Sequence, residues 1–235
     1  MTPRVSIVVP AFNEEALLEA NLARIEAFCE RAALSHELIV VDDGSVDATR
    51  PIALRFAERR PQVTIVGLDT NVGLGGALRA GIEASTAPVI VTLDADLTYA
   101  PEHIERLVAA CSPSTAIVIA SPYAPGGRVT GVPRHRLALS RLANRLLARR
   151  LGLATSTSMV RAYSRDFVTE ALATIDDRDV SLGLLRAAQR AGRTVVEVPA
   201  HLDWSAVPDR ESRLRTRDSI AAVARAWRSS RPSPR

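Results

Sequence analysis

The sequence predicts an α/β fold with a doubly wound, mostly parallel sheet that helices cover on both faces. Two observations predict it: short apolar runs rich in Val and Ile alternate with amphipathic stretches, and polar turns follow the runs. With 47% hydrophobic and 24% charged residues, the chain has the composition of a folded globular protein. We therefore expect one domain over residues 1–228, followed by a disordered tail at 229–235.

The first half contains five predicted strands, each short and apolar enough to lie inside a sheet. They cover residues 5–9, 37–41, 63–67, 88–93 and 116–120. Helices are expected between them, at residues 13–33, 47–59, 74–85 and 101–110. Asn13 and Glu14 open the first helix, Asp47 is a plausible cap of the second, and Pro101 suits the start of the fourth.

The second half is less regular. A loop rich in Pro and Gly at 122–133 precedes a basic helix at 134–151 and an extended stretch at 155–163. Two helices, one strand, a polar loop and a last helix are then expected, at 165–174, 180–191, 194–198, 199–211 and 215–227.

Composition excludes several chemistries. All 30 basic residues are Arg and none is Lys. Mechanisms that need a lysine, such as a Schiff base, a phosphate-loop Lys or a Ser–Lys dyad, are therefore excluded. Cys29 and Cys111 lack metal-site spacing, which predicts a reducing cytoplasm without zinc or disulfides. We expect no membrane-spanning helix, because no apolar run approaches about 20 residues. The amino terminus shows no signal-peptide pattern.

Positive charge is concentrated in the middle of the chain. The net charge is +4, yet ten Arg and no acidic residue lie between Arg106 and Arg165, so this block should face phosphates or acidic lipids. On the helix at 134–151, leucines and arginines occupy largely different faces: Leu139, Leu142 and Leu146 against Arg134, Arg141 and Arg145. Such a helix suits a membrane interface, although a core-packed surface helix with solvated arginines fits equally well. Nucleic acid is not expected, because only 4% of residues are aromatic and no binding motif is present.

Acidic residues follow two of the predicted strands, Asp42 and Asp43 after the second and Asp94 and Asp96 after the fourth. In parallel sheets, ligands bind beyond the carboxyl ends of the strands. Residues i and i+2 of an extended chain point the same way, and paired carboxylates suit Mg²⁺ or Mn²⁺. The pair alone also fits a solvated turn; the placement of both clusters favours a metal site.

Four segments occur in a characteristic order: SIVVPAFNEE at 6–15, VDDGSVDAT at 41–49, NVGLGGA at 71–77 and DADL at 94–97. This series resembles family 2 glycosyltransferases with the GT-A fold, most closely the polyprenyl- and dolichyl-phosphate sugar synthases. The resemblance spans about the first 125 residues. It implies a nucleotide-sugar and metal-binding half at 1–125 and an acceptor half at 126–228.

The resemblance also implies roles for individual residues. Asp94 and Asp96 would hold Mg²⁺ or Mn²⁺ against the donor diphosphate and count as catalytic. The nucleobase and ribose would be held by Pro10, Phe12, Glu14 and Asp43, with Asp42 beside them. Gly73 begins a glycine-rich segment that permits close backbone approach to the donor, although a tight turn is an equally good interpretation.

In the second half the likeness is partial. Arg161 fits the family pattern, but the Asp and Gly expected before it are missing. Arg210 and Arg213 lie in a segment similar to one that binds phosphates in the polyprenyl- and dolichyl-phosphate sugar synthases. A surface loop with ion pairs is the alternative. Gly183 stands where the resemblance expects a carboxylate, which leaves Asp179 as the catalytic candidate on that side.

The resemblance implies inverting, metal-dependent transfer of a sugar from a GDP- or UDP-sugar to a polyprenyl or dolichyl phosphate. A lipid phosphate is already ionised at neutral pH, since its second pKa is about 6, and needs no general base. Two alternatives remain: a catalytically weak or inactive binding module, and transfer to a hydroxyl. A sugar-nucleotide pyrophosphorylase is disfavoured, because its glycine-rich basic loop is absent after the first strand. We expect a cytoplasmic protein, peripheral at the inner face of the membrane.

Overall fold

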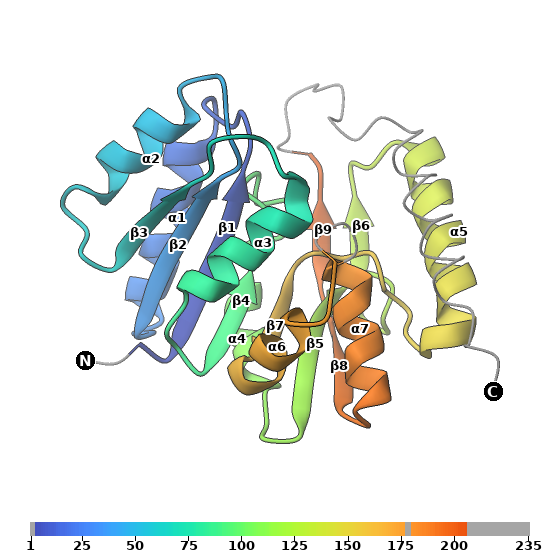
Figure 1. The fold of residues 1–235 in the computed structure, drawn as a ribbon. Helices are drawn as coiled ribbons and strands as arrows, with labels where there is room; N and C mark the ends of the chain where they lie inside the picture. Colours follow the sequence, from blue (N-terminus) through green and yellow to red (C-terminus); the bar gives the residue numbers. More distant parts are fainter. Residues whose placement is uncertain (1–2, 177–179, 206–235) are drawn as a thin grey trace.

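The computed structural model describes residues 3–176 and 180–205, and it contains a seven-stranded sheet between two layers of helices (Figure 1). The strand order is β3–β2–β1–β4–β7–β5–β8. Only β7 runs antiparallel to its neighbours in this sheet. The expected mostly parallel, doubly wound sheet is therefore confirmed.

The described elements are of ordinary length for an α/β domain. The strands of the large sheet are β1 (Val5–Ala11), β2 (His36–Asp42), β3 (Val63–Gly67), β4 (Val89–Thr92), β5 (Thr115–Ser121), β7 (Arg161–Ser164) and β8 (Thr194–Pro199). The helices are α1 (Leu18–Arg31), α2 (Thr49–Ala57), α3 (Gly73–Ala84), α4 (His103–Ala109), α5 (Arg134–Leu151), α6 (Arg165–Leu172) and α7 (Val180–Arg190).

Each face of the sheet has its own hydrophobic core. Successive strand residues alternate between them: Ile7 and Val9 pack with α1, α2 and α4, whereas Val8 packs with α3, α6 and α7. The contact of α3 with the sheet is very close. A Cβ on Gly81 would lie 2.3 Å from a methyl of Val8, so only glycine fits at this point of α3.

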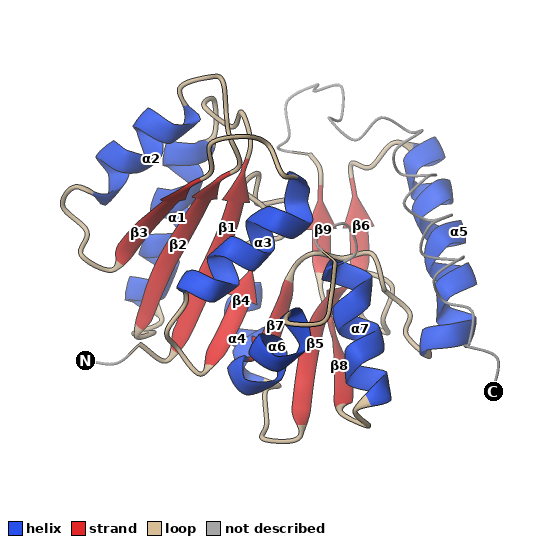
Figure 2. Ribbon diagram, in the orientation of Figure 1, coloured by secondary structure: helices blue, strands red, loops and turns tan. Residues whose placement is uncertain are grey.

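Two expectations about the elements were wrong. Arg128–Thr130 (β6) and His201–Asp203 (β9) pair in parallel as a second small sheet, where loops were expected (Figure 2). The first helix begins at Leu18 rather than Asn13, because Asn13 adopts a φ of 53° that an α-helix excludes. The expected helix at 215–227 and the tail at 229–235 lie outside the described residues, and the limits of the domain stay a prediction.

The parallel strands bring three loops to one edge of the sheet. Ala11 and Asp42 are register partners at the ends of β1 and β2, and Asp42 in turn pairs with Gly67 of β3. Figure 2 shows the arrowheads of these strands directed to the same edge. The acidic residues that follow β2 and β4 therefore lie at this edge. Among the described residues, no helix is long and apolar enough to cross a membrane.

A buried polar cluster lies between α1 and β2. His36 Nε2 is 2.6 Å from Glu26 Oε1, and their side chains are 9% and 7% exposed. Burial disfavours the charged imidazole, but hydrogen bonds with Cys29 and Glu26 outweigh it and raise the pKa of His36 to about 10. Burial also works against the Glu26 carboxylate, yet hydrogen bonds from His36 and Gln62 hold its pKa below the usual value.

This pair predicts a pH-dependent stability. Because the folded-state pKa of His36 exceeds the unfolded value of 6.5, its contribution is complete below pH 6.5 and is lost as the pH rises towards about 10. Urea denaturation across this range should show the free energy of unfolding falling. In His36→Gln the fall should be smaller; an equal fall in both proteins would contradict the assignment.

Candidate active site

The loops after β1 and β2 are tied together by reciprocal hydrogen bonds. The Asn13 amide donates to Ser45 Oγ (2.8 Å), and the Val46 amide donates to Asn13 Oδ1 (2.9 Å). The Glu14 amide donates to Thr49 Oγ1 (2.6 Å). Each loop therefore satisfies backbone donors of the other, which fixes Phe12 and Glu14, two of the expected donor-binding residues, at the tip of β1.

Asp42 organises the loop after β2 from inside. Its carboxylate is fully buried, accepts a hydrogen bond from the Ser45 amide (3.4 Å) and forms an ion pair with Arg50 Nε at 2.7 Å. Arg50 also donates to the Leu68 carbonyl. The structure thus gives Asp42 a supporting position, in keeping with its expected place beside the donor residues. Arg50 was not singled out from the sequence.

Asp43 connects the same loop to the start of α3. Its Oδ1 accepts a hydrogen bond from the Val72 amide (2.8 Å), and its Oδ2 accepts one from Gly73 (3.0 Å). Gly73, with a φ of +83°, is the first residue of α3, so the carboxylate meets the positive end of the helix dipole. Burial and Asp42 nevertheless raise the pKa of Asp43, against the lowering effect of these amides.

Gly44 allows this close approach. Its φ is +68°, and a Cβ there would lie 2.5 Å from the Thr70 carbonyl carbon and 2.6 Å from the Asn71 amide nitrogen. A side chain would force the loop after β2 away from the loop after β3. The three loops therefore form one fixed frame around the carboxyl ends of β1, β2 and β3.

Asp43→Ala is expected to loosen this frame. Loss of a carboxylate that caps the first turn of a helix costs about 1 to 2 kcal/mol of unfolding free energy, and nucleotide binding should weaken with it. Urea denaturation and calorimetric titration with UDP and GDP measure the two effects. Asp69→Ala, an exposed position before the same helix, is the control and should change neither. Equal behaviour of the two variants would contradict the role of Asp43.

Asp94 and Asp96 come from the tight turn after β4. The Leu97 amide donates to the Asp94 carbonyl (3.1 Å), and Leu97 has a φ of 50°. The Thr98 amide donates to Asp96 Oδ1 (3.0 Å), and Asn21 of α1 donates to the intervening Ala95 carbonyl (2.9 Å). Backbone and amide contacts thus set the turn from both sides.

The two carboxylates form an electrostatically coupled pair. Burial raises the pKa of Asp94, and the charge of Asp96 raises it further, to about 7. Within the described part of the chain, no hydrogen-bond donor or cation compensates Asp94. Two hard oxygen donors that repel one another suit a divalent cation such as Mg²⁺ or Mn²⁺, which offsets the repulsion. No group of three or more potential ligand side chains occurs among the described residues, so water and substrate oxygens would complete the coordination.

Tyr99 follows the turn that contains the aspartate pair. Its ring is buried and meets His103 edge-on at a centroid distance of 6.0 Å. Burial raises the pKa of Tyr99, a hydrogen bond with Ser158 lowers it, and the Asp94 charge raises it. The Tyr99 hydroxyl therefore connects the turn that contains Asp94 with the segment that contains Ser158.

Arg161 differs from the expectation. Its side chain is completely buried, and it donates to three backbone carbonyls, those of Ser158 (2.8 Å), Ser156 (2.8 Å) and Ser181 (2.7 Å). The guanidinium therefore joins the segment before β7 to the start of α7. We correct its assignment from substrate contact to a structural clamp, because these three bonds and complete burial withdraw the group from solvent.

Asn144 and Glu197 hold the same segment and were missed in the sequence. Asn144 Oδ1 accepts from the Ser156 amide (2.7 Å), and the two Glu197 oxygens accept from the amides of Ala154 and Thr155 (both 2.7 Å). A lone acid in an otherwise apolar strand is a usable signal, since buried carboxylates need partners. The single amide in a helix of leucines and arginines is a similar, weaker one.

Gly183, where the resemblance expects a carboxylate, lies against an apolar neighbour. A Cβ on Gly183 would lie 2.6 Å from the Ile175 Cγ2 methyl, so this part of α7 packs against an aliphatic side chain.

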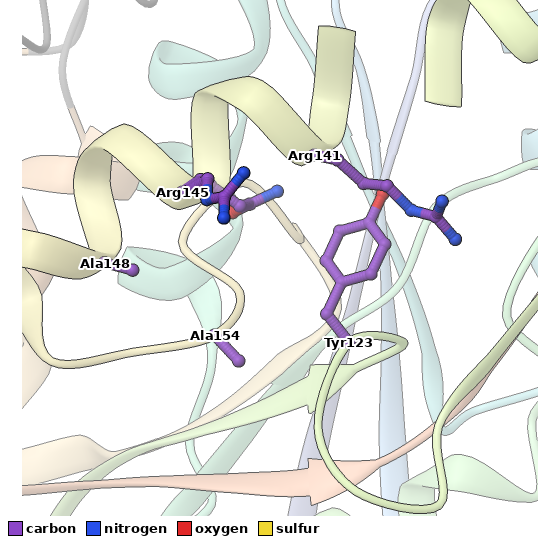
Figure 3. A pocket seen from close by; sticks show the side chains of 6 residues that line it. Tyr123, Arg141, Arg145, Ala148 and Ala154 are labelled. Atoms are coloured by element: carbon purple, nitrogen blue, oxygen red, sulfur yellow. The ribbon is translucent and has the colours of Figure 1, made fainter. Parts of the chain in front are cut away.

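Asp179, Arg210 and Arg213 lie outside the described residues, and their roles stay predictions. Pro10 lies near the end of β1, opposite Val41. Neither Asp94 nor Asp96 lines either of two cavities found among the described residues, one of which is shown in Figure 3.

Comparison with known proteins gives consistent results. The model of glycosyl transferase family 2 matches residues 6–172. The polyprenol monophosphomannose synthase of Mycolicibacterium smegmatis is 33% identical over 207 residues, which cover 84% of this chain and 77% of the relative. The undecaprenyl-phosphate 4-deoxy-4-formamido-L-arabinose transferase of Enterobacter sp. (strain 638) is 33% identical over 84% of this chain. The chain spans only 59% of that relative's length.

Solved structures share the fold at lower identity. The glucosyl-3-phosphoglycerate synthase of Mycobacterium tuberculosis, solved with UDP, has a TM-score of 0.68 at 23% identity over 95% of this chain and 80% of its own. A mannosyltransferase of Pyrobaculum calidifontis, solved with GDP-Man and Mn²⁺, has a TM-score of 0.61 at 22% identity, over 90% of this chain and 59% of its own. Both therefore have the same overall fold as this chain.

Proposed function

This chain belongs to glycosyl transferase family 2, and from that premise we propose that it transfers a sugar from a nucleotide-sugar donor to the phosphate of a polyprenyl-type lipid. The donor binds with Mg²⁺ or Mn²⁺ at the carboxyl ends of β1, β2 and β4. The acceptor approaches from the half of the molecule that contains α5. The reaction takes place at the cytoplasmic face of the membrane.

The observation that carries this proposal is the arrangement of the acidic residues. Asp94 and Asp96 are a coupled carboxylate pair at the end of β4. Asp42 and Asp43, which support the frame, lie at the end of β2, two strands away at the same sheet edge. A nucleoside diphosphate needs both features, a surface for the nucleoside and a cation for the diphosphate. The solved relatives with UDP and with GDP-Man and Mn²⁺ support this combination.

Different residues of this chain bind the nucleoside and the cation. Phe12 and Glu14, on the loop fixed to Ser45 and Thr49, contact the nucleoside, and Asp94 and Asp96 hold the cation. When bound, the cation stabilises the negative charge that develops on the departing diphosphate. An acceptor phosphate is mostly dianionic at neutral pH, since its second pKa is about 6. It attacks the anomeric carbon directly and inverts its configuration.

The packing of α7 favours a phosphate acceptor over a hydroxyl. A hydroxyl acceptor requires a general base, but Gly183 is closed off by Ile175 and offers no room for a carboxylate. The same feature favours a second candidate function, a module that binds nucleotide sugar without turnover. The first candidate, transfer to a lipid phosphate, is supported by the names of the two relatives, which refer to polyprenol and to undecaprenyl phosphate.

Release of nucleoside diphosphate tests the proposal. The purified protein is incubated with Mg²⁺ or Mn²⁺, a panel of UDP- and GDP-sugars and a polyprenyl phosphate in detergent. We expect release from at least one donor that requires both the cation and the acceptor. Donor binding without release from any donor would favour the binding module, and a lack of both would contradict the function.

The outward face of α5 supports contact with a membrane. Leu142 is 55% exposed, and Leu139 and Leu146 on the same side are half-buried. Arg141 and Arg145 of the same helix are exposed, and leucines next to exposed arginines are the pattern of a helix in a lipid interface.

Leu142→Glu is expected to lower binding to vesicles that contain anionic lipid, because it places a negative charge on this face. Leu54 of α2 is 53% exposed and supplies a matched control, Leu54→Glu, which should leave binding unchanged. Co-sedimentation at low and high salt measures both, and binding of the wild type should fall with salt. Binding that is insensitive to salt and to Leu142→Glu would contradict membrane contact through α5.

A further inference from the structure

Arg50 connects two of the loops that form the frame at the ends of β1, β2 and β3. It lies in the first turn of α2, and its Nε is 2.7 Å from Asp42 Oδ2. The same guanidinium donates to the carbonyl of Leu68, the residue that follows β3. The Leu68 amide in turn donates to the Asp42 carbonyl (2.9 Å). Arg50, Asp42 and Leu68 are therefore joined in a closed ring of contacts.

The end of β3 leaves room for the guanidinium. A Cβ on Gly67 would lie 3.0 Å from Arg50 Cζ and 3.2 Å from its Nε, which is closer than an ordinary van der Waals contact. The guanidinium therefore lies directly against the backbone of Gly67. A side chain at this position would press on the guanidinium, so the glycine allows the ring of contacts to close.

Arg50 also supplies the positive charge next to Asp42. The Asp42 side chain is completely buried, whereas the side chain of Arg50 is 36% exposed. Among the described residues, no other cation forms an ion pair with Asp42. Removal of one partner leaves a buried charge without compensation, which is strongly unfavourable. Loss of Arg50 should therefore disturb the loop after β2 at its first residue.

The Asp42 side of the ring leads to the loop after β1. Asp42 Oδ1 accepts a hydrogen bond from the Ser45 amide (3.4 Å), and Ser45 Oγ accepts one from the Asn13 amide (2.8 Å). Asn13 lies between Phe12 and Glu14, the residues proposed to contact the nucleoside. A displacement of Asp42 would therefore reach both of them through two hydrogen bonds.

The Leu68 side of the ring leads to the start of α3. The loop that begins at Leu68 ends with Val72 and Gly73, whose amides donate to the two oxygens of Asp43 (2.8 and 3.0 Å). Arg50 thus supports the frame from two sides. A site that already has its bound shape binds more tightly, because less conformational freedom is lost on binding.

We infer that Arg50 is a positioning residue for the nucleotide-sugar donor. It acts through Asp42 and Leu68, which keep the loops of the frame in their nucleoside-binding arrangement, and it does not touch the donor itself. This inference rests on the proposed function and adds to it a residue of α2 that determines donor affinity. The effect is confined to the donor, because Asp94 and Asp96 are held by contacts of their own turn.

Nucleotide binding and steady-state kinetics of Arg50→Met test the inference. Met keeps the apolar stem and can make neither bond. In calorimetric titration with UMP, UDP, GMP and GDP in the presence of Mn²⁺, each nucleotide that the wild type binds should bind about tenfold more weakly. The KM for the donor should rise about tenfold, while kcat stays within about twofold of the wild type. All assays are run well below the denaturation temperature of each variant.

Two further variants complete the experiment. Arg50→Lys keeps the charge but lacks the planar fork that makes both bonds, so it should lose less affinity than Arg50→Met, about threefold. It also replaces Arg50→Met if that variant does not fold. Arg55→Met is the matched control, since Arg55 is exposed on the same helix and forms no ion pair among the described residues. It should bind nucleotide like the wild type.

Three outcomes would overturn the inference. Unchanged nucleotide affinity in Arg50→Met, or an equal loss in Arg55→Met, would remove the positioning role. A loss for UDP and GDP that spares UMP and GMP would show direct contact with the diphosphate. A fall in kcat with an unchanged KM for the donor would leave Arg50 with a role in the fold alone.

Failure of the proposed function is distinguishable from failure of this inference. If only the function fails, Arg50→Met still weakens nucleotide binding, and the wild type releases no nucleoside diphosphate from any donor. If only the inference fails, the wild type transfers sugar and Arg50→Met has the same KM for the donor. A wild type that binds none of the four nucleotides would contradict both.

Discussion

Asp94→Asn and Asp96→Asn are each expected to lower the rate of sugar transfer about 1000-fold. Loss of one preorganised electrostatic stabiliser lowers a rate about 100- to 1000-fold, and each substitution also weakens binding of the cation. Neither variant should be less stable than the wild type in the presence of a chelator, because each removes one of two carboxylates that repel one another. Steady-state kinetics at saturating Mn²⁺ and thermal denaturation with EDTA measure the two effects.

Asp166→Asn is the matched control, since it removes one exposed carboxylate from α6. It should retain the activity of the wild type. Retention of substantial activity by either aspartate variant would contradict a catalytic role for the pair. A large loss of stability in Asp94→Asn would instead assign the pair to the fold.

Arg161→Met is expected to lower the free energy of unfolding by about 3 to 5 kcal/mol, because it leaves buried carbonyls without a donor. The three acceptors belong to segments on both sides of β7, so the loss should extend from the 156–158 segment to the start of α7. Urea denaturation measures the stability, and hydrogen exchange locates the change.

Arg190→Met supplies the comparison, because Arg190 is exposed at the end of α7. It should change the free energy of unfolding by no more than about 0.5 kcal/mol. If Arg161→Met were as stable as the wild type and only the affinity for donor or acceptor fell, the original assignment to substrate contact would be correct and the structural clamp wrong.

The placement of the acidic residues at one edge of the sheet was predictable because it depends on local patterns. Asp42 ends β2 and Asp94 lies two residues after β4, and parallel strands bring their carboxyl ends to one edge. The side-chain pattern of each segment was enough to place its strand. The agreement therefore reflects the regular geometry of the sheet, in which a strand determines where the next residue lies.

Contacts between distant segments were not predictable in this way. Arg161 adjoins residues of a family-like pattern, yet its inward orientation depends on carbonyls as far away as Ser181. Glu197 likewise reaches back 42 and 43 residues, to the amides of Thr155 and Ala154. The strands β6 and β9 are only three residues long, and their pairing depends on tertiary context rather than on their own composition.

Binding of Mn²⁺, followed by its paramagnetic resonance signal, tests the central claim most directly. The account predicts that one Mn²⁺ per chain binds in the presence of UDP or GDP, and that Asp94→Asn and Asp96→Asn abolish this binding while Asp166→Asn retains it. Binding that needs no nucleotide and persists in both aspartate variants would contradict the account, as would a complete lack of Mn²⁺ and Mg²⁺ binding.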